Sequence, residues 1–441
     1  MKSEIKKMKV VWICHFSNKQ VREHLPLSKM KFNNFLRSLF GKKTTKYRDY
    51  ASWVSNFIKE FEKFEDVELH VIAPHNGLIP FKYEFQISGI HYHFFRSEFF
   101  YFFSKLQNLI FRNRKRKYFL NRYYVRRFVK KIKPDIINLI GTENPYYSIS
   151  VLDIYDVPIF VTVQTVYTNP LRKIYSDSYS KSIWDLELKI HNKEKYFGCD
   201  GRIYRDLILN NNSKAIIFKI FFPVQRPTGV IDVPKEYDFV FFAAIVTVKK
   251  GIEDAIEALF IAKNEKENIS LNVVGACDEE YKAYLMEKIA QKGLEDNISF
   301  NSYFPIHTDM HQHIKKSKFA LLPVKLDVIP GTIKEAALLE IPIVAYKTTG
   351  TPYINKNGEA ILISDIGDVQ GLADNMIKLM KSQELAEKLK KNAKKFIEQE
   401  FDNTKNGRVL VNVYQAVYNH FHNNIPIPEE LLFNTNEFPL Y

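Results

Sequence analysis

This chain is built from short apolar runs that alternate with longer helical patterns, and the whole alternation occurs twice along the sequence. The runs are rich in Val, Ile and Phe and lack the regular polar positions of a strand with one solvated face. Such runs are typical of parallel sheets that helices cover on both faces. In the first set they are Lys9–Cys14, Val67–Ala73, Ile136–Ile140, Pro158–Gln164 and Ala215–Phe222. In the second set they are Asp238–Ala243, Ser270–Gly275, Ile298–Asn301, Phe319–Pro323, Pro342–Ala345 and Ala360–Ile363.

A proline-rich segment separates the two sets. Residues 223–236 contain three prolines and a glycine, and 441 residues are too many for one compact core. We therefore predict a doubly wound α/β fold with one Rossmann-like domain over 1–228 and a second over 229–402, facing each other across a cleft. A last helix and a polar tail, 403–441, end the chain, and a return of this part to the first domain is one option. Helical patterns cover 48–65, 105–133, 252–265, 279–293, 309–316, 332–340, 368–381, 384–400 and 403–421.

Positive charge is concentrated in the first half of the chain. Residues 1–230 hold 40 Lys and Arg against 20 Asp and Glu, a net of +20, whereas 231–441 hold 24 against 30, a net of −6; together they give the total of +14. The densest part is 94–133, where basic residues alternate with Phe and Tyr. A basic, aromatic helix fits an anionic membrane surface, but a solvated helix face with core aromatics has the same pattern. We do not expect nucleic acid as a partner.

Nothing in the sequence resembles a signal peptide or a membrane span. The apolar run near the N-terminus covers only Val10–Cys14. The three cysteines, Cys14, Cys199 and Cys277, lie far apart and form neither a disulfide framework nor a zinc-ligand spacing. We expect a cytoplasmic protein that is either free in solution or attached peripherally to the inner face of the membrane.

The sequence lacks the motifs of several nucleotide- and metal-dependent enzymes. No G-x-G-x-x-G follows a strand and no G-x-x-x-x-G-K-[ST] occurs, which argues against a dinucleotide enzyme and a P-loop nucleotidase. There is no G-x-S-x-G nucleophile motif. There is no Asp-x-Asp pair, and we find no histidine or cysteine cluster with metal-ligand spacing. We therefore expect neither a metal nor a cofactor.

Two polar segments follow strands of the second set. Lys249 and Lys250 precede a glycine that leads into a helix, so a lysine there reaches the mouth of the sheet, where a phosphate accepts its charge. Taken alone, an exposed lysine pair is more often only solvated. The hydroxyl-rich loop 348–351 follows another strand and marks the same edge. Ligands of such sheets bind beyond the carboxyl ends of the strands, so this edge is the candidate site.

A pair of acids frames the start of a helix at this edge. Asp327 lies in the loop after a strand, and Glu335, eight residues later, lies in the next helix. Pro330 and Gly331 between them let the backbone approach a ligand, and the helix N-terminus offers N–H groups that suit a diphosphate. The two carboxylates suit the hydroxyl pairs of sugars. The plainer alternative is that Glu335 stabilises the helix dipole and Asp327 is a surface residue.

Together these positions resemble glycosyltransferase family 4, the retaining nucleotide-sugar transferases with two Rossmann-like domains (GT-B). The resemblance is best over 237–400. VFFAAIVTVKKGIEDAIEA is similar to the first strand, phosphate loop and helix of the family, and LNVVGA is similar to its second strand. The run from ISFNSY to IPIVA contains its acidic motif, two acids separated by seven residues, and NGEAILI resembles a segment near its end.

The resemblance implies a role for each matching residue. Glu335 would bind the ribose diol of the donor nucleotide, most commonly UDP. Asp327 would hold hydroxyls of the donor sugar, and Lys250 would contact the diphosphate. The further donor-binding residues that the resemblance implies are Lys249, Arg202, Ser302, Tyr303, Gly331, Thr332 and Ile333, the last three through their backbone.

The chain departs from the family pattern at several positions. Ala244 and Ile245 stand where the family has a Gly-Arg pair, so Lys249 or a residue across the cleft would supply the second positive charge. Gln164 replaces a histidine of the N-terminal domain; it is a candidate catalytic residue that can hydrogen-bond a sugar hydroxyl but cannot carry a proton. On the acceptor side the expected residues are His15, Ser17 and Glu143.

The resemblance implies a metal-independent, retaining transfer of a hexosyl group from a nucleotide-sugar to a glycan or lipid-linked acceptor in cell-surface glycan synthesis. The domain 1–228 would receive the acceptor and 229–402 the donor. One alternative is a nucleotide-sugar epimerase of the same fold, which would change the donor without an acceptor. The other is a non-catalytic GT-B relative that binds an acidic polymer or a membrane. The UDP affinity, and its loss in Glu335→Ala, would separate an active from a degenerate donor site.

Overall fold

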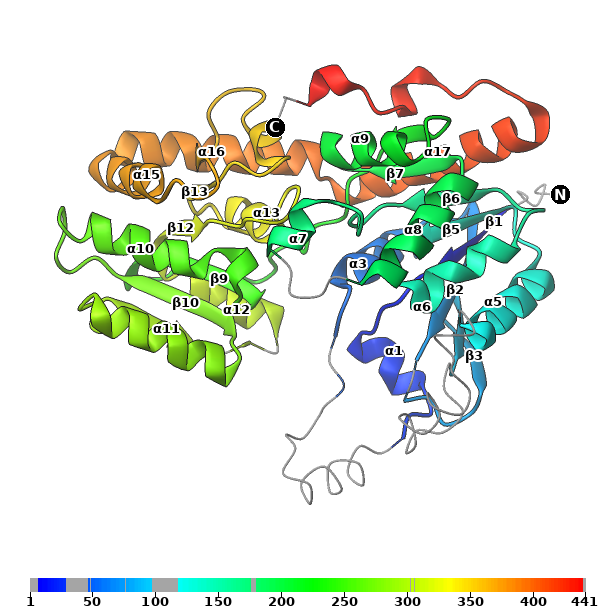
Figure 1. Cartoon of the computed structure of the whole chain (residues 1–441), viewed down its shortest axis with the longest axis horizontal. Helices are drawn as coiled ribbons and strands as arrows, with labels where there is room; N and C mark the ends of the chain where they lie inside the picture. The colour runs from blue at the N-terminus through cyan, green and yellow to red at the C-terminus, as the bar shows by residue number, and fades with distance from the viewer. Residues whose placement is uncertain are drawn as a thin grey trace.

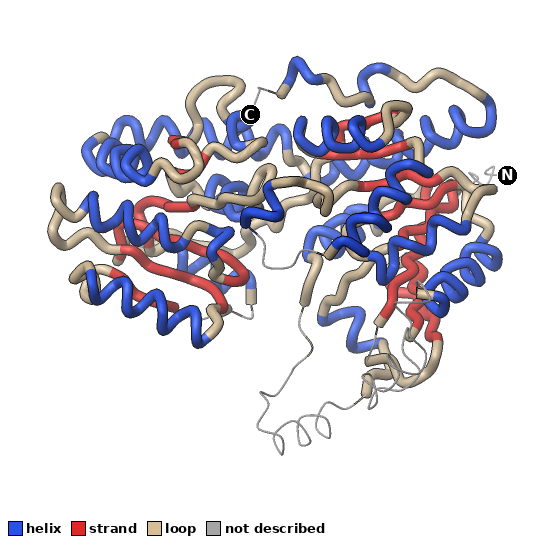
Figure 2. The backbone as a smooth tube through the Cα atoms, in the orientation of Figure 1, coloured by secondary structure: helices blue, strands red, loops and turns tan. Residues whose placement is uncertain are grey.

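The computed structural model describes residues 7–28, 47, 49–75, 77–96, 118–175, 180–301, 303–304 and 306–438. It contains two α/β domains, one from each half of the chain (Figure 1). In each domain the strands lie between helices, as the continuous apolar runs predict (Figure 2).

An eight-stranded sheet forms the centre of the N-terminal domain. Its order is β3-β4-β2-β1-β5-β6-β7-β8, and every neighbouring pair is parallel except β3 with β4. Because β1 pairs with both β2 and β5, the loops that follow these three strands meet at one edge of the sheet. The strands are β1 (Met8–Ile13), β2 (Val67–Pro74), β3 (Lys82–Ile87), β4 (Ile90–Phe95), β5 (Ile136–Ile140), β6 (Ile159–Thr162), β7 (Tyr196–Cys199) and β8 (Ile216–Lys219).

Two of the described helices of this domain begin at asparagine caps, and the longer helices bury an apolar stripe. Asn18 accepts a hydrogen bond from the Val21 amide and starts the first helix. In the long helix before β5, Val125, Phe128 and Ile132 recur at helical spacing and are buried against the sheet. The helices are α1 (Lys19–His24), α3 (Ser52–Phe61), α5 (Phe119–Ile132), α6 (Pro145–Ser148), α7 (Leu171–Tyr175), α8 (Lys181–Lys193) and α9 (Arg202–Asn211).

The C-terminal domain is built on a six-stranded, all-parallel sheet. Its order is β11-β10-β9-β12-β13-β14, so β9 lies in the middle beside β10 and β12. The strands are β9 (Tyr237–Ile245), β10 (Leu271–Ala276), β11 (Ile298–Asn301), β12 (Ser317–Leu322), β13 (Ile343–Tyr346) and β14 (Leu362–Ser364). The helices are α10 (Ile252–Ala262), α11 (Glu279–Gln291), α12 (His307–Ile314), α13 (Gly331–Leu338), α14 (Thr351–Ile354), α15 (Val369–Lys381), α16 (Gln383–Glu400) and α17 (Asn403–Asn423).

The helix α17 leaves the C-terminal domain and packs on the N-terminal one. Figure 1 shows α16 and α17 following one another along one side of the molecule. The buried Tyr414 hydroxyl accepts a hydrogen bond of 2.6 Å from the Asn138 amide in β5. On the surface, Arg408 forms an ion pair of 2.6 Å with Asp66. The last helix of the chain is therefore part of the first domain's core.

The segment after α17 contacts both domains. The Phe433 amide donates to the Ile217 carbonyl in β8, and Glu437 forms an ion pair with Lys219 of the same strand. One residue further, Phe438 stacks on Tyr353 of the C-terminal domain with ring centroids 4.4 Å apart. The segment after α17 therefore links the two domains through contacts with each of them.

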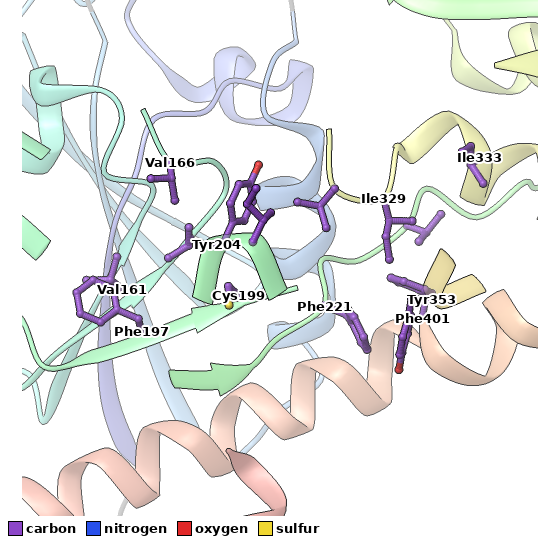
Figure 3. Packing of buried hydrophobic residues seen from close by; sticks show 14 of the residues in the cluster. Val161, Val166, Phe197, Cys199, Tyr204, Phe221, Ile329, Ile333, Tyr353 and Phe401 are labelled. Atoms are coloured by element: carbon purple, nitrogen blue, oxygen red, sulfur yellow. The ribbon is translucent and has the colours of Figure 1, made fainter. Parts of the chain in front are cut away.

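One buried hydrophobic cluster runs without a break from the N-terminal into the C-terminal domain. It includes Tyr204 of α9 and Ile329 of the loop before α13, both shown in Figure 3. Phe221 places its ring 5.7 Å from Tyr353 and 4.7 Å from Phe401. Burying these side chains stabilises one arrangement of the two domains, because apolar surface is removed from water at their boundary.

The basic stretch 94–133 is described in part, and 97–117 lies outside the described residues. Phe94 and Phe95 belong to the core of the sheet. On α5 the exposed residues Phe119, Tyr123, Arg126, Arg127 and Lys130 lie on one face of the helix. None of the helices that the model describes has a length and an apolar character sufficient for crossing a bilayer.

Candidate functional site

The carboxyl ends of β9 and β12 bring together two residues that are far apart in sequence. Lys250 ends the short 3₁₀ turn after β9, and Asp327 lies in the loop after β12. The Lys250 Nζ atom is 3.4 Å from Asp327 Oδ2. Both side chains are partly exposed, at 26% and 36%. A cation and a carboxylate therefore stand side by side at the edge of the sheet where ligands of such folds bind.

The turn that carries Lys250 depends on the glycine that follows it. Gly251 has φ of +79°, and an added Cβ atom would lie 1.9 Å from the Pro323 carbonyl oxygen. Backbone atoms at that distance cannot give way without moving β12. The Lys325 amide also donates to the Lys249 carbonyl at 2.9 Å, which ties the two loops together.

We expect Gly251→Ala to destabilise the protein by roughly 2 to 4 kcal/mol, because left-handed strain and the clash with the carbonyl add up. Gly293→Ala is the matched control, since Gly293 also has a positive φ of +60° but has nothing within 4 Å of an added Cβ. That control should lose only about 1 kcal/mol of strain. Urea unfolding of both variants measures the difference, and equal losses would contradict the proposed clash.

The N-terminus of α13 lies between the two acids of the motif. Pro330 precedes the helix, and an added Cβ atom on Gly331 would meet nothing within 4 Å, so this backbone is open to a ligand. The first amides of a helix have no acceptor within it, and they attract anions. The Ile333 side chain is buried in the core and its amide donates to the Pro330 carbonyl, so Ile333 holds the turn. Thr332 is partly exposed beside Gly331.

Glu335 points toward two histidines of α12. Its Oε2 atom lies 3.2 Å from His307 Nε2 and 3.2 Å from His311 Nε2. Burial opposes ionisation of this carboxyl, but the hydrogen bonds from both histidines outweigh burial and hold its pKa below the ordinary value. We expected no histidine or cysteine cluster with metal-ligand spacing, and the group of His307, His311 and Glu335 corrects that expectation. The four-residue spacing of His307 and His311 was its signal, but the third member lies on another helix.

The hydroxyl-rich loop after β13 holds the backbone beside Asp327. The Thr348 hydroxyl donates 2.6 Å to the Val328 carbonyl, and the Thr348 amide in turn donates to the Thr351 hydroxyl. Both threonines are buried. At Gly350 an added Cβ atom would lie 2.6 Å from Val328. Through Thr348 and Thr351 this loop therefore fixes the approach to α13.

The N-terminal domain meets this site through the start of α9. An added Cβ atom on Gly201 would lie 2.4 Å from Val328, so the two domains touch directly here. Burial raises the pKa of the neighbouring Asp200 to about 6, while the Lys334 ammonium opposes the shift. Arg202 is the first residue of α9 and lies at this boundary, with its Nε atom 3.8 Å from Asp206. No motif in the sequence pointed to Asp200 or Lys334.

A small pocket of about 20 Å³ lies between the domains at this point. Side chains of both domains line it: Asn169, Leu171, Ile203, Tyr204, Lys325, Leu326, Asp327, Val328, Thr348, Thr349 and Ile366. Because Asp327 forms part of this wall, the Lys250–Asp327 pair lies at the boundary between the two domains.

The loops after β5 and β6 bring Glu143 and Gln164 together above Gly141. An added Cβ atom on Gly141 would lie 2.7 Å from Glu143 Oε2 and 2.9 Å from Gln164 Nε2. Gln164 donates to the Ile140 carbonyl at 3.0 Å, whereas Glu143 Oε2 is buried without a hydrogen-bond partner. Burial raises the pKa of Glu143 to about 7, the Glu187 charge adds to the shift, and Arg172 opposes it.

The raised pKa of Glu143 predicts how the stability of the folded protein depends on pH. The folded state holds the Glu143 proton more tightly than the unfolded state, so stability falls as the pH rises from about 4.5 to about 7 and then stays level. Glu143→Gln cannot ionise and should therefore be more stable than the natural chain by roughly 3 kcal/mol at pH 8, with little difference at pH 4. Urea unfolding at both pH values tests this, and a difference independent of pH would contradict it.

Of the remaining predicted residues, His15 packs near Tyr147, whose hydroxyl lies at the same point above Gly141. The His15 Nε2 atom lies 2.8 Å from the Tyr50 hydroxyl, and burial lowers the pKa of His15 to about 4. Ser17 is buried and its hydroxyl accepts from Arg22, so it stabilises its own loop. Tyr303 is exposed after β11, and Ser302 lies outside the described residues.

Part of this chain is similar in sequence to known proteins. Residues 229–396 match the family model described as glycosyl transferases group 1. The chain is 24% identical over 152 residues to 2-deoxystreptamine N-acetyl-D-glucosaminyltransferase of Niallia circulans, which covers 34% of this chain and 38% of that protein. It is 24% identical over 181 residues to the capsular polysaccharide biosynthesis glycosyltransferase CapM of Staphylococcus aureus, covering 39% and 43%. The match thus spans about two fifths of these curated relatives.

Solved structures match over nearly the whole chain. Sucrose-phosphate synthase from Thermosynechococcus elongatus has a TM-score of 0.67 at 11% identity and covers 93% of this chain and 99% of that one. Anabaena HepE in complex with UDP and glucose has a TM-score of 0.59 at 13% identity, covering 92% and 99%. At sequence identities this low, the structural similarity shows the fold alone. The chain therefore has the two-domain GT-B fold that its sequence predicts, with the segment similar to glycosyl transferases group 1 in its C-terminal domain.

Proposed function

We propose that this protein is a retaining glycosyltransferase that moves a hexosyl group from a UDP-sugar to a glycan or lipid-linked acceptor in cell-surface glycan synthesis. The observation that carries the proposal is the 3.4 Å pair of Lys250 and Asp327 beside the open N-terminus of α13. This arrangement lies within the residues that match the glycosyltransferase model. The similarity to CapM supports a polysaccharide acceptor, and the likeness to HepE, whose complex holds UDP, supports the nucleotide.

The donor would lie across the edge of the C-terminal sheet. Glu335 accepts hydrogen bonds from the ribose diol, and its partly buried carboxylate is already ionised for that role. The diphosphate receives positive charge from Lys250 and amides from Gly331 and Thr332. Asp327 holds hydroxyls of the sugar and keeps Lys250 in place until the diphosphate arrives. Lys249 and Arg202 are the remaining cations assigned to the phosphates.

In the reaction, the bond between the anomeric carbon and the phosphate oxygen breaks as the acceptor oxygen bonds to the same face of that carbon. The electron pair of the broken bond stays on the diphosphate, where Lys250 and the helix N-terminus stabilise the charge. The acceptor proton moves to a phosphate oxygen, so no protein base and no divalent ion is required. The wall of residues from both domains excludes water, which would otherwise hydrolyse the donor.

The acceptor would enter from the N-terminal domain. Glu143 and Gln164 face the same point above Gly141, where a carboxyl and an amide can hold sugar hydroxyls. His15 lies in the loop after β1, which neighbours β5 in the sheet. The exposed aromatic and basic face of α5 provides a surface for an anionic membrane, which would bring a lipid-linked acceptor close.

A screen of nucleotides and nucleotide-sugars by thermal shift tests the donor assignment, because a ligand that binds the folded state raises the melting temperature. We expect UDP and one UDP-sugar to give the largest shifts, and turnover to need an acceptor and to persist in a chelator. Conversion of the donor without any acceptor would replace the proposal by an epimerase. Absence of any shift with all nucleotides would leave a non-catalytic binder.

A further inference from the structure

The histidines that face Glu335 form a donor set suited to a metal ion. His307 and His311 are four residues apart on α12, so their rings project from one face of the helix. Their rings are nearly perpendicular, at 88°, with centroids 4.6 Å apart. Both Nε2 atoms converge on the same oxygen of Glu335, and the three ligand atoms lie within 4.8 Å of one another.

Two of the three separations between ligand atoms match those of tetrahedral coordination, and the third is no more than 4.8 Å. Zinc bonds of 2.0 to 2.2 Å to nitrogen and oxygen place neighbouring ligand atoms about 3.3 Å apart in a tetrahedron. The observed separations of 3.2 Å from Glu335 to each histidine nearly equal that value. Two imidazoles and one carboxylate suit zinc and similar transition metals, whereas Mg²⁺ and Ca²⁺ prefer oxygen ligands alone.

Two of the three ligand side chains are held by packing, and the third is exposed to solvent. The His311 side chain is 1% exposed and Glu335 is 15% exposed, so packing holds these two ligands in place. His307 is 45% exposed and opens the fourth coordination position to solvent. Both contacts are hydrogen bonds to one carboxylate oxygen, and a bound metal would take the place of the two Nε2 protons.

A second group in the described residues is less suited to a metal. Glu68, His70 and His91 also lie within 4.8 Å of one another. However, His70 is already in a chain of hydrogen bonds, with Glu68 on one nitrogen and His93 on the other. The rings of His70 and His91 stack at 14°, so they are nearly parallel and do not face a common point as the α12 pair does.

We propose that His307, His311 and Glu335 bind Zn²⁺ or a similar transition metal, and that the bound ion blocks the donor nucleotide. Metal binding stands on the geometry of the three ligands alone. The blocking rests on the proposed function, because it follows only if Glu335 also receives the ribose diol. Zinc on Oε2 would take one of the two oxygens that a ribose diol needs for a two-point contact with this carboxylate, so the two ligands compete for Glu335.

Titration of the metal-free, full-length protein tests the site. Co²⁺ should produce the visible absorption of tetrahedral coordination, and Zn²⁺ should displace it. We expect His307→Ala and His311→Ala each to weaken Zn²⁺ binding by at least about 100-fold, since even indirect partners of metal sites contribute 10- to 100-fold. His313→Ala on the same helix and His91→Ala in the second group should leave it unchanged. The His307 side chain is exposed, so His307→Ala should fold normally. If this variant binds Zn²⁺ as tightly as the natural chain, the proposal is overturned.

Competition separates the metal site from the nucleotide site. With free Zn²⁺ held by a chelator buffer at ten times its Kd, the apparent Kd for UDP should rise about tenfold in the natural chain and not in His307→Ala. Zn²⁺ binding with no UDP binding would retain the metal site and reject the proposed function. UDP binding without Zn²⁺ binding would do the reverse, and simultaneous binding of both would reject the blocking.

Discussion

Replacing Glu335 by alanine is expected to weaken UDP binding by roughly 100-fold or more. Each hydrogen bond from a ribose hydroxyl to an ionised carboxylate contributes about 1.5 to 3 kcal/mol, and two of them are lost together. Calorimetric titration of UDP into the metal-free variant in a chelating buffer measures the loss. A variant that binds UDP as tightly as the natural chain would remove Glu335 from the donor site.

Two further variants show whether the effect is specific. Glu340 follows the same helix and forms an ion pair with Lys394 on the surface, so Glu340→Ala removes an acid without touching the site. This control should bind UDP normally. Glu335→Gln keeps an oxygen acceptor but loses the charge, and we expect an intermediate affinity. A far-ultraviolet circular dichroism spectrum of each variant checks that the total helix content is unchanged.

Replacing Lys250 by alanine is expected to reduce kcat by roughly 100- to 1,000-fold, with a smaller effect on UDP binding. The lysine stabilises the charge that develops on the leaving diphosphate, and removal of one such donor has this effect in other enzymes. The 3.4 Å contact with Asp327 shows that Nζ already stands at the correct edge of the sheet. Initial rates at saturating donor and acceptor measure the change.

The matched control for this variant removes a lysine elsewhere in the same domain. Lys263 at the end of α10 donates to the Gly293 carbonyl on the surface, and Lys263→Ala should leave kcat unchanged. Lys249→Ala reports on the second positive charge, because the family's arginine is replaced by the exposed Ile245. A normal kcat in Lys250→Ala together with a large loss in Lys249→Ala would exchange the roles of the two lysines.

Most of the parallel strands were predictable because their sequences are short, continuous apolar runs. The hairpin of β3 and β4 was missed, since Lys82–Ile87 is mostly exposed or half-buried and lacks such a run. Its turn is only Ser88-Gly89, with φ of 48° and 81°, a two-residue connection that has a recognisable local signal. β7 was also missed: its four residues are buried, but the run is short, contains Gly198 and lies between polar residues.

The candidate site shows the same division between local and tertiary information. Strand order brings Lys250 to Asp327 across 77 positions of sequence, and the sequence predicted this because both residues follow strands. The contact of Glu335 with two histidines depends on how α12 packs against α13, which no local pattern encodes. The burial of Ser17 is a similar case, since its partner Arg22 hides a hydroxyl that the sequence suggested was available.

The course of α17 has a consequence for anyone who divides this molecule. A fragment ending near the proline-rich linker would leave the first sheet without Tyr414, and Asn138 in its middle would lose the hydroxyl to which it donates. The complementary fragment would carry α17 with its apolar face exposed to water. An N-terminal domain that folds by itself would therefore need the last 40 or so residues fused to it. A cut at the proline-rich linker alone does not separate the two folding units.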